Sequence, residues 1–379
     1  MKIISGSITS PAGYRANGMA AGIKKSGKPD LALIYSEIPA VCAGVFTKNS
    51  IKAAPLIVSI EHLRSDSAQA IIINSGNANC FTGDFGLLYA KQSTEIIAKL
   101  LGIKITDVLV TSTGIIGKTL PFNKIESAAP ALVAGLSQKG SHKAANAILT
   151  TDLKTKEIAV QIMLSGKKVT IGGIAKGSGM IAPNMATMLA FLTTDAAISP
   201  KMLKTALTRA NDKSFNCITV DGCMSTNDMV TLMANGLAGN RPIVKSGKDF
   251  EIFCEALDHV CLDLAKKIVI DGEGATKFIE ISVNGAKSEK QAREAALAIA
   301  NSVLFKTAAY GSNPNWGRVA AAVGSLELNI TEEKLKIKFS PFSKKEIHIN
   351  VDLNLGYAKA TVYTCDLSLD YVRINGKYN

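Results

Sequence analysis

Apolar runs alternate with segments of helical spacing along most of the chain, and together they predict a mixed α/β fold. Apolar and β-branched runs predict strands at residues 31–46, 68–73, 107–111 and 218–220. Leucine and isoleucine recur at helical spacing over residues 86–101, 123–135 and 250–269. Ser199-Pro200 predicts a further helix that continues to about Asp212. Ser165-Gly166 predicts the turn of a hairpin formed by residues 156–163 and 168–174.

The last hundred residues show a different pattern, richer in strands. A strand is predicted at residues 277–283 and one helix at 289–305. Three more strands are predicted at residues 334–339, 346–353 and 357–364, and we expect them to be antiparallel around Gly356. The sequence therefore predicts a smaller, β-rich lobe that begins at about residue 280.

Composition indicates an ordinary globular protein of 379 residues, 47% of them hydrophobic. The N-terminus has no basic region followed by an apolar stretch. The most apolar segment, 181–198, is interrupted by Pro183, Asn184 and Asp195. We therefore expect a cytoplasmic protein. The cysteines are odd in number and form no Cys-x-x-Cys pair, so we expect them to be reduced and mostly buried. Four scattered histidines argue against a metal site.

The net charge of +12 raises the question of a nucleic-acid partner. Lysines are dispersed rather than clustered with aromatic residues, which make up only 6% of the chain. This pattern favours small carboxylate ligands or a solvated surface over DNA or RNA. A nucleic-acid-binding protein would show strong, salt-sensitive binding, and its absence in a filter-binding assay would exclude that class.

Four short segments are dense in Gly, Asn, Ser and Thr, where a packed core would be apolar. They are 74–80, 111–117, 175–187 and 313–317. Buried polar groups need hydrogen-bond partners, and backbone amides near glycine can hold anions. Taken singly, each segment could equally be a turn.

The second of these segments resembles a phosphate-binding loop. Ser112 to Thr119 differs from G-x-x-x-x-G-K-[ST] at one position, where Ser112 replaces the first glycine. A nucleotide hydrolase or kinase is therefore an alternative. The missing glycine and the Leu120-Pro121 pair, which stands where a helix should propagate, both argue against it.

The third segment carries the most specific signal. Residues 176–191, Lys-Gly-Ser-Gly-Met-Ile-Ala-Pro-Asn-Met-Ala-Thr-Met-Leu-Ala-Phe, are followed by Thr194-Asp195. This run resembles the self-processing signature of the glutamate N-acetyltransferase family, also called ornithine acetyltransferases. Other segments match the same family in order along nearly the whole chain: 13–24, 44–49, 73–83, 112–114, 221–228, 311–317 and 366–375.

The resemblance implies a layered fold and a chain that cuts itself. Stacked sheets would lie between helical layers, with the smaller lobe attached. Cleavage between Ala186 and Thr187 would give an alpha fragment, 1–186, and a beta fragment, 187–379, assembled as a heterotetramer with two copies of each. The Thr187 hydroxyl would then be the nucleophile. The new α-amine, with a reference pKa of about 7.7–8.0, would be its base.

The resemblance also assigns roles around Thr187. The Thr113 hydroxyl and the Gly114 amide would hold the oxyanion. Lys176 would bind the substrate α-carboxylate and Glu273 the ornithine ammonium. Further implied substrate contacts are Thr151, with Thr150 as an alternative, Asn375 and Asn379. The family usually continues past the final tyrosine motif with a Ser- or Thr-bearing tail. In this sequence Asn379 takes that role, or the pocket is more open.

The implied reaction moves acetyl from N2-acetylornithine to glutamate through acetyl-Thr187, in arginine biosynthesis. Some members of the family also accept acetyl-CoA as donor, and no metal or bound cofactor is required. The alternative with the same nucleophile is a self-processing aminopeptidase or amidase, in which water replaces glutamate as acceptor.

Overall fold

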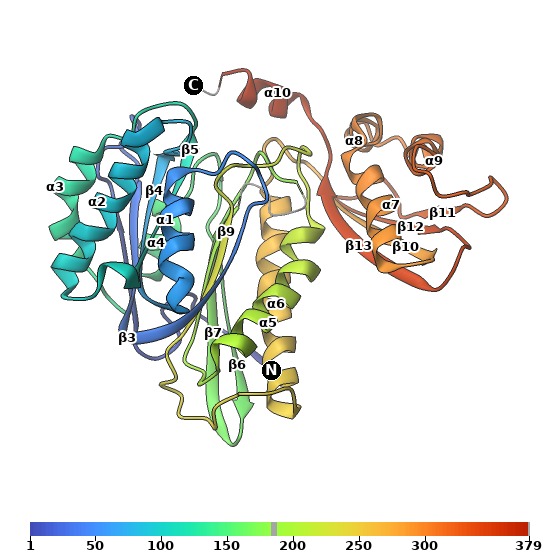
Figure 1. Ribbon diagram of the computed structural model, residues 1–379. Coiled ribbons are helices and arrows are strands. Elements are labelled where there is room, and N and C mark those ends of the chain that lie inside the picture. The colour runs from blue at the N-terminus through green and yellow to red at the C-terminus, as the bar shows by residue number, and fades with distance from the viewer. Residues whose placement is uncertain (183–187, 378–379) are drawn as a thin grey trace.

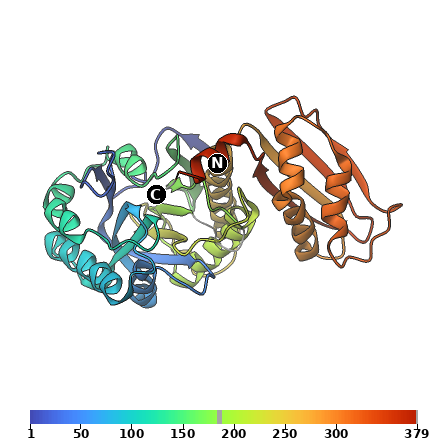
Figure 2. The same ribbon diagram turned by 90° about the horizontal axis from the view of Figure 1, so that it is seen from above.

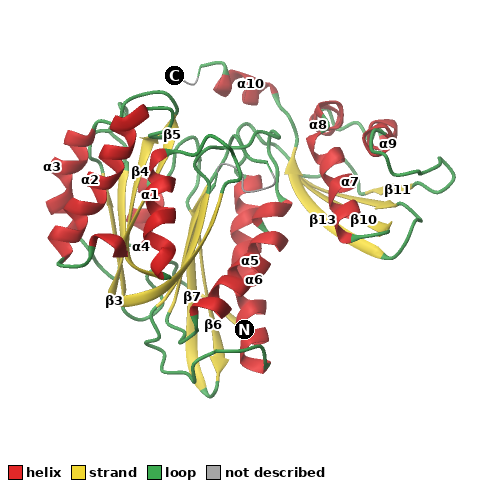
Figure 3. Cartoon of the chain, in the orientation of Figure 1, coloured by secondary structure: helices red, strands yellow, loops and turns green. Residues whose placement is uncertain are grey.

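The chain folds into a layered body and a smaller lobe beside it (Figures 1 and 3). The computed structural model describes residues 1–182 and 188–377. The strands of the body are β1 (Lys2–Ile4), β2 (Tyr14–Met19), β3 (Leu31–Phe46), β4 (Ser67–Asn77), β5 (Val108–Ile115), β6 (Lys156–Leu164), β7 (Lys167–Lys176), β8 (Leu189–Thr194) and β9 (Met229–Ala234). Its helices are α1 (Ala54–His62), α2 (Gly83–Leu101), α3 (Phe122–Ala134), α4 (Ser141–Ala147), α5 (Pro200–Lys213) and α6 (Lys248–Ile270).

One long strand joins the two sheet layers of the body. The main path of the sheet is β1-β6-β7-β8-β9-β3-β4-β5, with β2 paired to β3. The first part of β3, Leu31–Tyr35, pairs with β4, and its last part, Val41–Phe46, pairs with β9. The register with β4 shifts between Tyr35 and Ala40. The sheet can therefore fold back over itself, so that two layers stack face to face.

Alternating side chains of the strands build three cores in the body. Leu31 and Leu33 pack with residues of α2 and α3 on one outer face, while Ile34 and Ile73 point between the layers toward Phe191. The opposite outer face packs on α5 and α6. This order of helices, sheet, sheet and helices confirms the layered α/β fold expected from the family (Figure 1).

The lobe has its own sheet and its own core. Its strands are β10 (Phe278–Ala286), β11 (Lys336–Phe339), β12 (Glu346–Asp352) and β13 (Ala358–Cys365), and its helices are α7 (Glu289–Asn301), α8 (Val303–Tyr310) and α9 (Trp316–Gly324). After β13 the chain returns toward the body through α10 (Leu369–Asn375), which lies between lobe and body in Figure 2. The C-terminal segment is thus part of the body's upper edge rather than of the lobe.

Several sequence predictions are confirmed closely. The strand at 31–46 has the predicted bounds, and the hairpin of β6 and β7 turns at Ser165 and Gly166, whose φ angles are 48° and 75°. α5 begins after Ser199 as predicted, although that serine makes no side-chain capping bond. The seven cysteines are free, and all but Cys223 are buried.

Three predictions in the second half are wrong. The helix expected at 289–305 is two helices, because the extended backbone of Ser302 ends α7 and its hydroxyl accepts from Phe305 N to cap α8. β12 and β13 are not neighbours, since β10 lies between them, parallel to β12 and antiparallel to β13. The strand expected at 218–220 is only an isolated bridge between Ile218 and Tyr363.

Candidate active site

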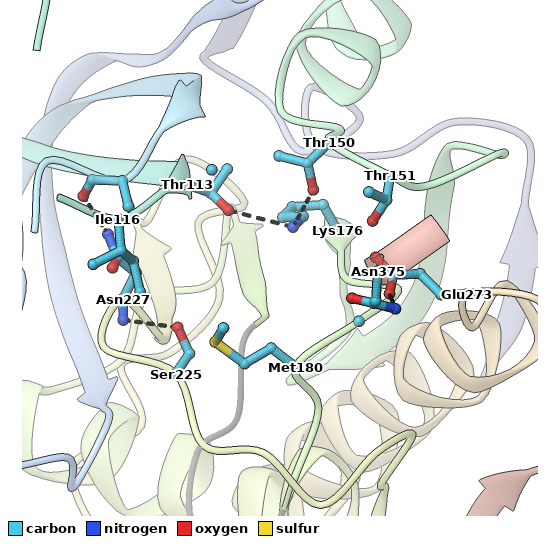
Figure 4. Close-up of a pocket in the computed structure, with 13 residues that line it drawn as sticks. Thr113, Ile116, Thr150, Thr151, Lys176, Met180, Ser225, Asn227, Glu273 and Asn375 are labelled. Atoms are coloured by element: carbon cyan, nitrogen blue, oxygen red, sulfur yellow. Dashed lines mark hydrogen bonds between the residues drawn. The ribbon is translucent and has the colours of Figure 1, made fainter. Parts of the chain in front are cut away.

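A small pocket of about 90 Å³ lies where the ends of β5 and β7 meet the loop after α6 (Figure 4). Its lining comes from segments far apart in the sequence: Ala78, Thr113, Gly114, Ile116, Thr150, Thr151, Lys176, Gly179, Met180, Ser225, Asn227, Glu273 and Asn375. Six of the residues singled out in the sequence lie here together: Thr113, Gly114, Thr151, Lys176, Glu273 and Asn375. The structure therefore places their side chains or backbones around one space.

Lys176, the last residue of β7, is the central cation of the pocket. Its ammonium donates to Thr150 Oγ1 at 2.9 Å and to Thr113 Oγ1 at 3.3 Å, as Figure 4 shows. Burial lowers the pKa of Lys176, while the carboxylate of Asp152, 3.9 Å from the ammonium, acts in the opposite direction. A substrate carboxylate would supply a further negative partner, in addition to Asp152, Glu273 and Asp228, and stabilise the charged form of Lys176.

Thr113 is the last buried residue of β5, and half-buried Gly114 follows it, next to β4. Gly114 pairs with Gly76, and its φ of 135° lies in the region that favours glycine. A Cβ at Gly114 would overlap the Gly76 carbonyl carbon and the Asn77 nitrogen. β4 and β5 can approach this closely because both paired residues, Gly76 and Gly114, lack a side chain. The backbone of Gly114 can therefore line the pocket.

Glu273 supplies the negative charge on the other side of the pocket. One oxygen accepts a 2.7 Å hydrogen bond from Asn375 Nδ2, and the carboxylate lies directly over Gly179, where a Cβ would overlap it. The backbone amide of Glu273 donates to Ser178 O at 2.9 Å. The loop after β7 and the loop after α6 are thereby fixed to each other, and Asn375 holds the C-terminal helix against both.

A buried ion cluster of Asp152, Lys156 and Asp271 supports both charged sides of the pocket. The Lys156 ammonium lies 2.7 Å from Asp152 Oδ1 and 2.6 Å from Asp271 Oδ2. Burial disfavours the Asp152 carboxylate, but the two lysines, Lys176 and Lys156, and the Gly177 amide hold its pKa well below its ordinary value. Because Asp152 follows Thr151 and Asp271 precedes Glu273 by two residues, the cluster joins two segments that line the pocket.

The Asp221 carboxylate fixes the chain just before the proposed cleavage site. It accepts from the backbone amides of Met180 at 2.6 Å and Ile181 at 2.9 Å, and from Tyr371 Oη at 3.2 Å. Burial, followed by the nearby Asp221 charge, raises the pKa of Tyr371. Tyr371 is thus a hydroxyl donor at neutral pH, and it anchors α10 over the pocket.

The chain just after the proposed cleavage site is also held by a buried carboxyl group. Met188 N donates to Asp228 Oδ1 at 3.1 Å. Burial raises the pKa of Asp228 well above its ordinary value, against the effect of the Met188 hydrogen bond. Lys176 lines the pocket and pairs with Leu189, which is two residues after Thr187 in the sequence, the expected nucleophile. Ala186, Thr187 and Asn379 themselves lie outside the described residues.

Sequence reasoning missed Asn227, Asp152, Tyr371 and Asp228 as site residues. Asn227 Nδ2 donates to the carbonyls of Ala78 at 2.7 Å and Ser112 at 2.8 Å, and so ties two of the polar segments together. The density of polar residues between 221 and 228 was the available signal. Between Thr150 and Thr151, the hydroxyl that contacts Lys176 is that of Thr150, although both line the pocket.

One of the four polar segments lies away from the pocket, and a second lines the pocket without being a phosphate-binding loop. Residues 313–317 lie in the lobe, where the Asn315 side chain accepts from Arg318 N to cap α9 and Trp316 is 64% exposed. The segment 112–119 does not form a phosphate-binding loop. β5 continues through Ile115, and the next helix, α3, begins only at Phe122.

Within residues 1–182 and 188–377, no group of three or more His, Cys, Asp or Glu side chains is placed to hold a metal ion. No helix in the described part of the chain is long and apolar enough to cross a membrane.

Comparison with known proteins gives matches that cover nearly the whole length of each relative. The arginine biosynthesis bifunctional protein ArgJ of Geobacter sulfurreducens is 46% identical, over 97% of this chain and 98% of that protein. The protein of the same name from Caldanaerobacter subterraneus is 46% identical over the whole of both. An ornithine acetyltransferase from Mycobacterium tuberculosis, solved with ornithine, is 37% identical over 48% of this chain and 97% of that one, with a TM-score of 0.45. A match to the ArgJ family extends over residues 15–379, and the chain therefore belongs to the ArgJ family.

Proposed function

We propose that this enzyme cuts its chain between Ala186 and Thr187 and transfers acetyl from N2-acetylornithine to glutamate through acetyl-Thr187. Acetyl transfer in arginine biosynthesis is the activity of its family. The observation that carries the proposal is the pocket at the end of β7, where Lys176, Glu273 and Thr113 face one space (Figure 4) and Gly114 of β5 also lines it. The strand that follows Thr187 pairs with the strand that ends in Lys176.

The charges of the pocket match an amino-acid substrate. An ornithine derivative carries an α-carboxylate and a side-chain ammonium, which would pair with Lys176 and Glu273. Glutamate, the acceptor, keeps the α-carboxylate but has a second carboxylate in place of the ammonium. That carboxylate would accept from Asn375 Nδ2 in competition with Glu273, or lie away from Glu273. Thr150 and Thr151 border the same space and would contact the acetyl or the carboxylate group.

The acyl step places charge on the carbonyl oxygen of the acetyl group. The Thr113 hydroxyl and the Gly114 amide would donate to that oxyanion, and each such donor typically contributes about 100- to 1,000-fold in rate. Because Lys176 donates to Thr113 Oγ1, the Thr113 hydroxyl hydrogen remains free to point at the substrate. The Thr187 α-amine would carry the proton from the hydroxyl to the leaving amine. No bound cofactor or metal takes part in this scheme.

The test combines fragment mass with an acetyl-transfer assay. Intact mass and N-terminal sequencing should give two fragments, the second beginning Thr-Met-Leu-Ala-Phe, and Thr187→Ala should abolish both cleavage and transfer. A Thr187→Ala protein that still splits or transfers acetyl would exclude this mechanism. Native mass of the cut protein then tests the proposed assembly of two alpha and two beta fragments.

A self-processing amidase uses the same nucleophile. Release of free acetate from N2-acetylornithine at the same rate with and without glutamate would favour the amidase, whereas glutamate-dependent formation of N-acetylglutamate favours the transferase.

A further inference from the structure

The cut that frees Thr187 needs a proton carrier that the transfer reaction does not supply. In acetyl transfer the Thr187 α-amine is the proposed base, but before the cut that nitrogen belongs to the Ala186–Thr187 peptide bond. A peptide nitrogen is a hydrogen-bond donor and not a base, and a threonine hydroxyl is a weak nucleophile without one. Another side chain must therefore hold and move the proton in the first step.

Two carboxyl groups hold the chain on either side of the proposed cut, and they differ in how fully they are bonded. Both oxygens of Asp221 accept from backbone amides, Oδ1 from Ile181 and Oδ2 from Met180. Asp228 uses only Oδ1, which accepts from Met188 N at 3.1 Å. No group within residues 1–182 and 188–377 hydrogen-bonds Asp228 Oδ2, although the side chain is fully buried. Buried oxygens without a partner are rare in native proteins, and a role in proton transfer would explain this one.

The surroundings of Asp228 favour a protonated carboxyl group. Burial raises the pKa of Asp228 well above its ordinary value. The Met188 hydrogen bond, the hydroxyls of Thr47 and Ser225, and the charge of Lys176 oppose this shift without cancelling it. Thr47 Oγ1 donates to the Ser225 carbonyl at 2.8 Å, so its hydrogen is not available to Oδ2. A neutral carboxyl group can give a proton to a reacting atom and then take one back.

Asp228 adjoins the reaction pocket without lining it. Asn227, the preceding residue, does line the pocket (Figure 4). Met188 is held through both its backbone polar atoms, because its nitrogen donates to Asp228 and its oxygen accepts from Met229 N at 3.2 Å. Since Met188 directly follows Thr187 in the sequence, Asp228 is anchored one residue from the bond that would be cut.

We propose that Asp228 moves the proton in the self-cleavage step, giving it to the Thr187 nitrogen as the chain is cut and recovering one from the Thr187 hydroxyl. This inference rests on the self-cleavage proposed above and adds a residue to it. The Thr187 oxygen forms a bond to the Ala186 carbonyl carbon as the bond from that carbon to the Thr187 nitrogen breaks. The hydroxyl proton replaces the one that Asp228 donated, so the carboxyl group ends neutral and the nitrogen becomes an amine.

Water then hydrolyses the ester. Its oxygen forms a bond to the Ala186 carbonyl carbon, the ester carbon–oxygen bond breaks, and one water proton restores the Thr187 hydroxyl. Asp228 is needed for the first of these two steps, in which no free α-amine exists.

The experiment follows the cut in full-length chains that have just been synthesised. A short radioactive pulse in a cell-free synthesis gives uncut precursor, and denaturing gels report its first-order cleavage between pH 5 and pH 9. In Asp228→Asn the amide oxygen can still accept from Met188 N, but the side chain cannot exchange a proton. Cleavage of Asp228→Asn should therefore be slower by about 100-fold or more, the usual contribution of a general acid or base. Asp228→Glu, which keeps the carboxyl group, should retain more of the rate than Asp228→Asn.

The pH profile separates proton transfer from a purely structural role. The wild-type rate should fall as the pH rises through the raised pKa of Asp228, because the carboxylate has no proton to give. Lys176→Met should move this fall to higher pH, since the loss of a positive charge disfavours ionisation of Asp228. The matched control is Asp195→Asn, at the opposite end of β8. Asp195 is also buried, accepts from backbone amides and has a raised pKa, and its variant should be cut at the wild-type rate.

The inference is overturned if Asp228→Asn, shown by circular dichroism to be folded, is cut at the wild-type rate. It is also overturned if the wild-type rate does not fall between pH 5 and pH 9, an outcome that needs no variant to fold. A wild-type chain that stays uncut, or a Thr187→Ala chain that is cut, would instead count against the proposed function.

Discussion

Replacing Lys156 with methionine removes the only cation that contacts both Asp152 and Asp271 in the described structure. The three side chains are almost fully buried, with exposed fractions of 1%, 0% and 7% for Lys156, Asp152 and Asp271. At contacts of 2.7 and 2.6 Å, each pair gains roughly 6 kcal/mol of Coulomb energy at an effective dielectric constant of about 20. Desolvation of the three charges offsets a large part of this gain.

The net loss of unfolding free energy depends on the two carboxylates that remain after Lys156 is replaced. Two carboxylates would stay buried without their shared partner, and breaking a buried pair in this way typically costs about 3–5 kcal/mol. This is a large fraction of the roughly 5–15 kcal/mol that stabilises a typical native protein. KM for N2-acetylornithine should also rise, because the cluster joins the segments of Thr151 and Glu273.

Urea unfolding followed by circular dichroism measures the effect at pH 7. The matched control is Lys154→Met, an exposed lysine two residues away, which should change the unfolding free energy by less than about 0.5 kcal/mol. The double variant Lys156→Met/Asp271→Asn should lose less than the sum of its parts, because it removes one unpaired charge. A Lys156→Met protein whose unfolding free energy is within about 1 kcal/mol of the wild-type value would show that the Lys156 ammonium does not stabilise the two buried carboxylates.

Three further predictions concern the same region. Thr113→Ala should leave a folded enzyme whose kcat is lower by about 100- to 1,000-fold, while Thr113→Ser should keep most of the wild-type rate. Equal rates for the wild type and both variants in a transfer assay would exclude Thr113 from the oxyanion site. Gly114→Ala should destabilise the fold by more than about 1 kcal/mol relative to Gly117→Ala, because both glycines have positive φ but only at Gly114 would a Cβ overlap with Gly76. Equal thermal-unfolding midpoints for the two variants would contradict this. The depressed pKa of Asp152 stabilises the protein above the unfolded value of about 3.9, and this contribution is lost as the pH falls through the lower folded value. The slope of unfolding free energy between pH 5 and pH 2 should therefore be smaller for Asp152→Asn, and identical slopes would count against the ion cluster.

Local features of the fold were predictable where the signal was itself local. The β6–β7 turn needs two residues that tolerate positive φ, and Ser165-Gly166 supplies them within the sequence. The break at Ser302 was hidden, because apolar spacing continues from α7 into α8 and only the serine's capping bond separates them. The insertion of β10 between β12 and β13 depends on pairing across more than fifty residues, which periodicity does not report.

The site was predictable mainly through the family resemblance. Thr113, Lys176, Glu273 and Asn375 stand in the pocket, yet composition alone gave each an equally good interpretation as a turn or a surface charge. Asp152 and Asn227 were missed because they act through backbone amides and carbonyls of other segments. Such roles depend on which loops the fold brings together.

The strand order of the large sheet determines how the cleaved protein would unfold and refold. β7 and β8, which flank the proposed cleavage site, are paired neighbours, and β3 of the first fragment pairs with β9 of the second. Cleavage would therefore leave two fragments sharing one continuous sheet. Once cut, unfolding also separates the fragments, so refolding becomes a second-order association whose midpoint depends on protein concentration. An uncut Thr187→Ala chain would refold in a unimolecular reaction. The fold of the self-cleaving enzyme would thus form before cleavage, while both parts belong to one chain. If the cleaved protein is denatured and diluted, the loss of the folded state would be effectively irreversible.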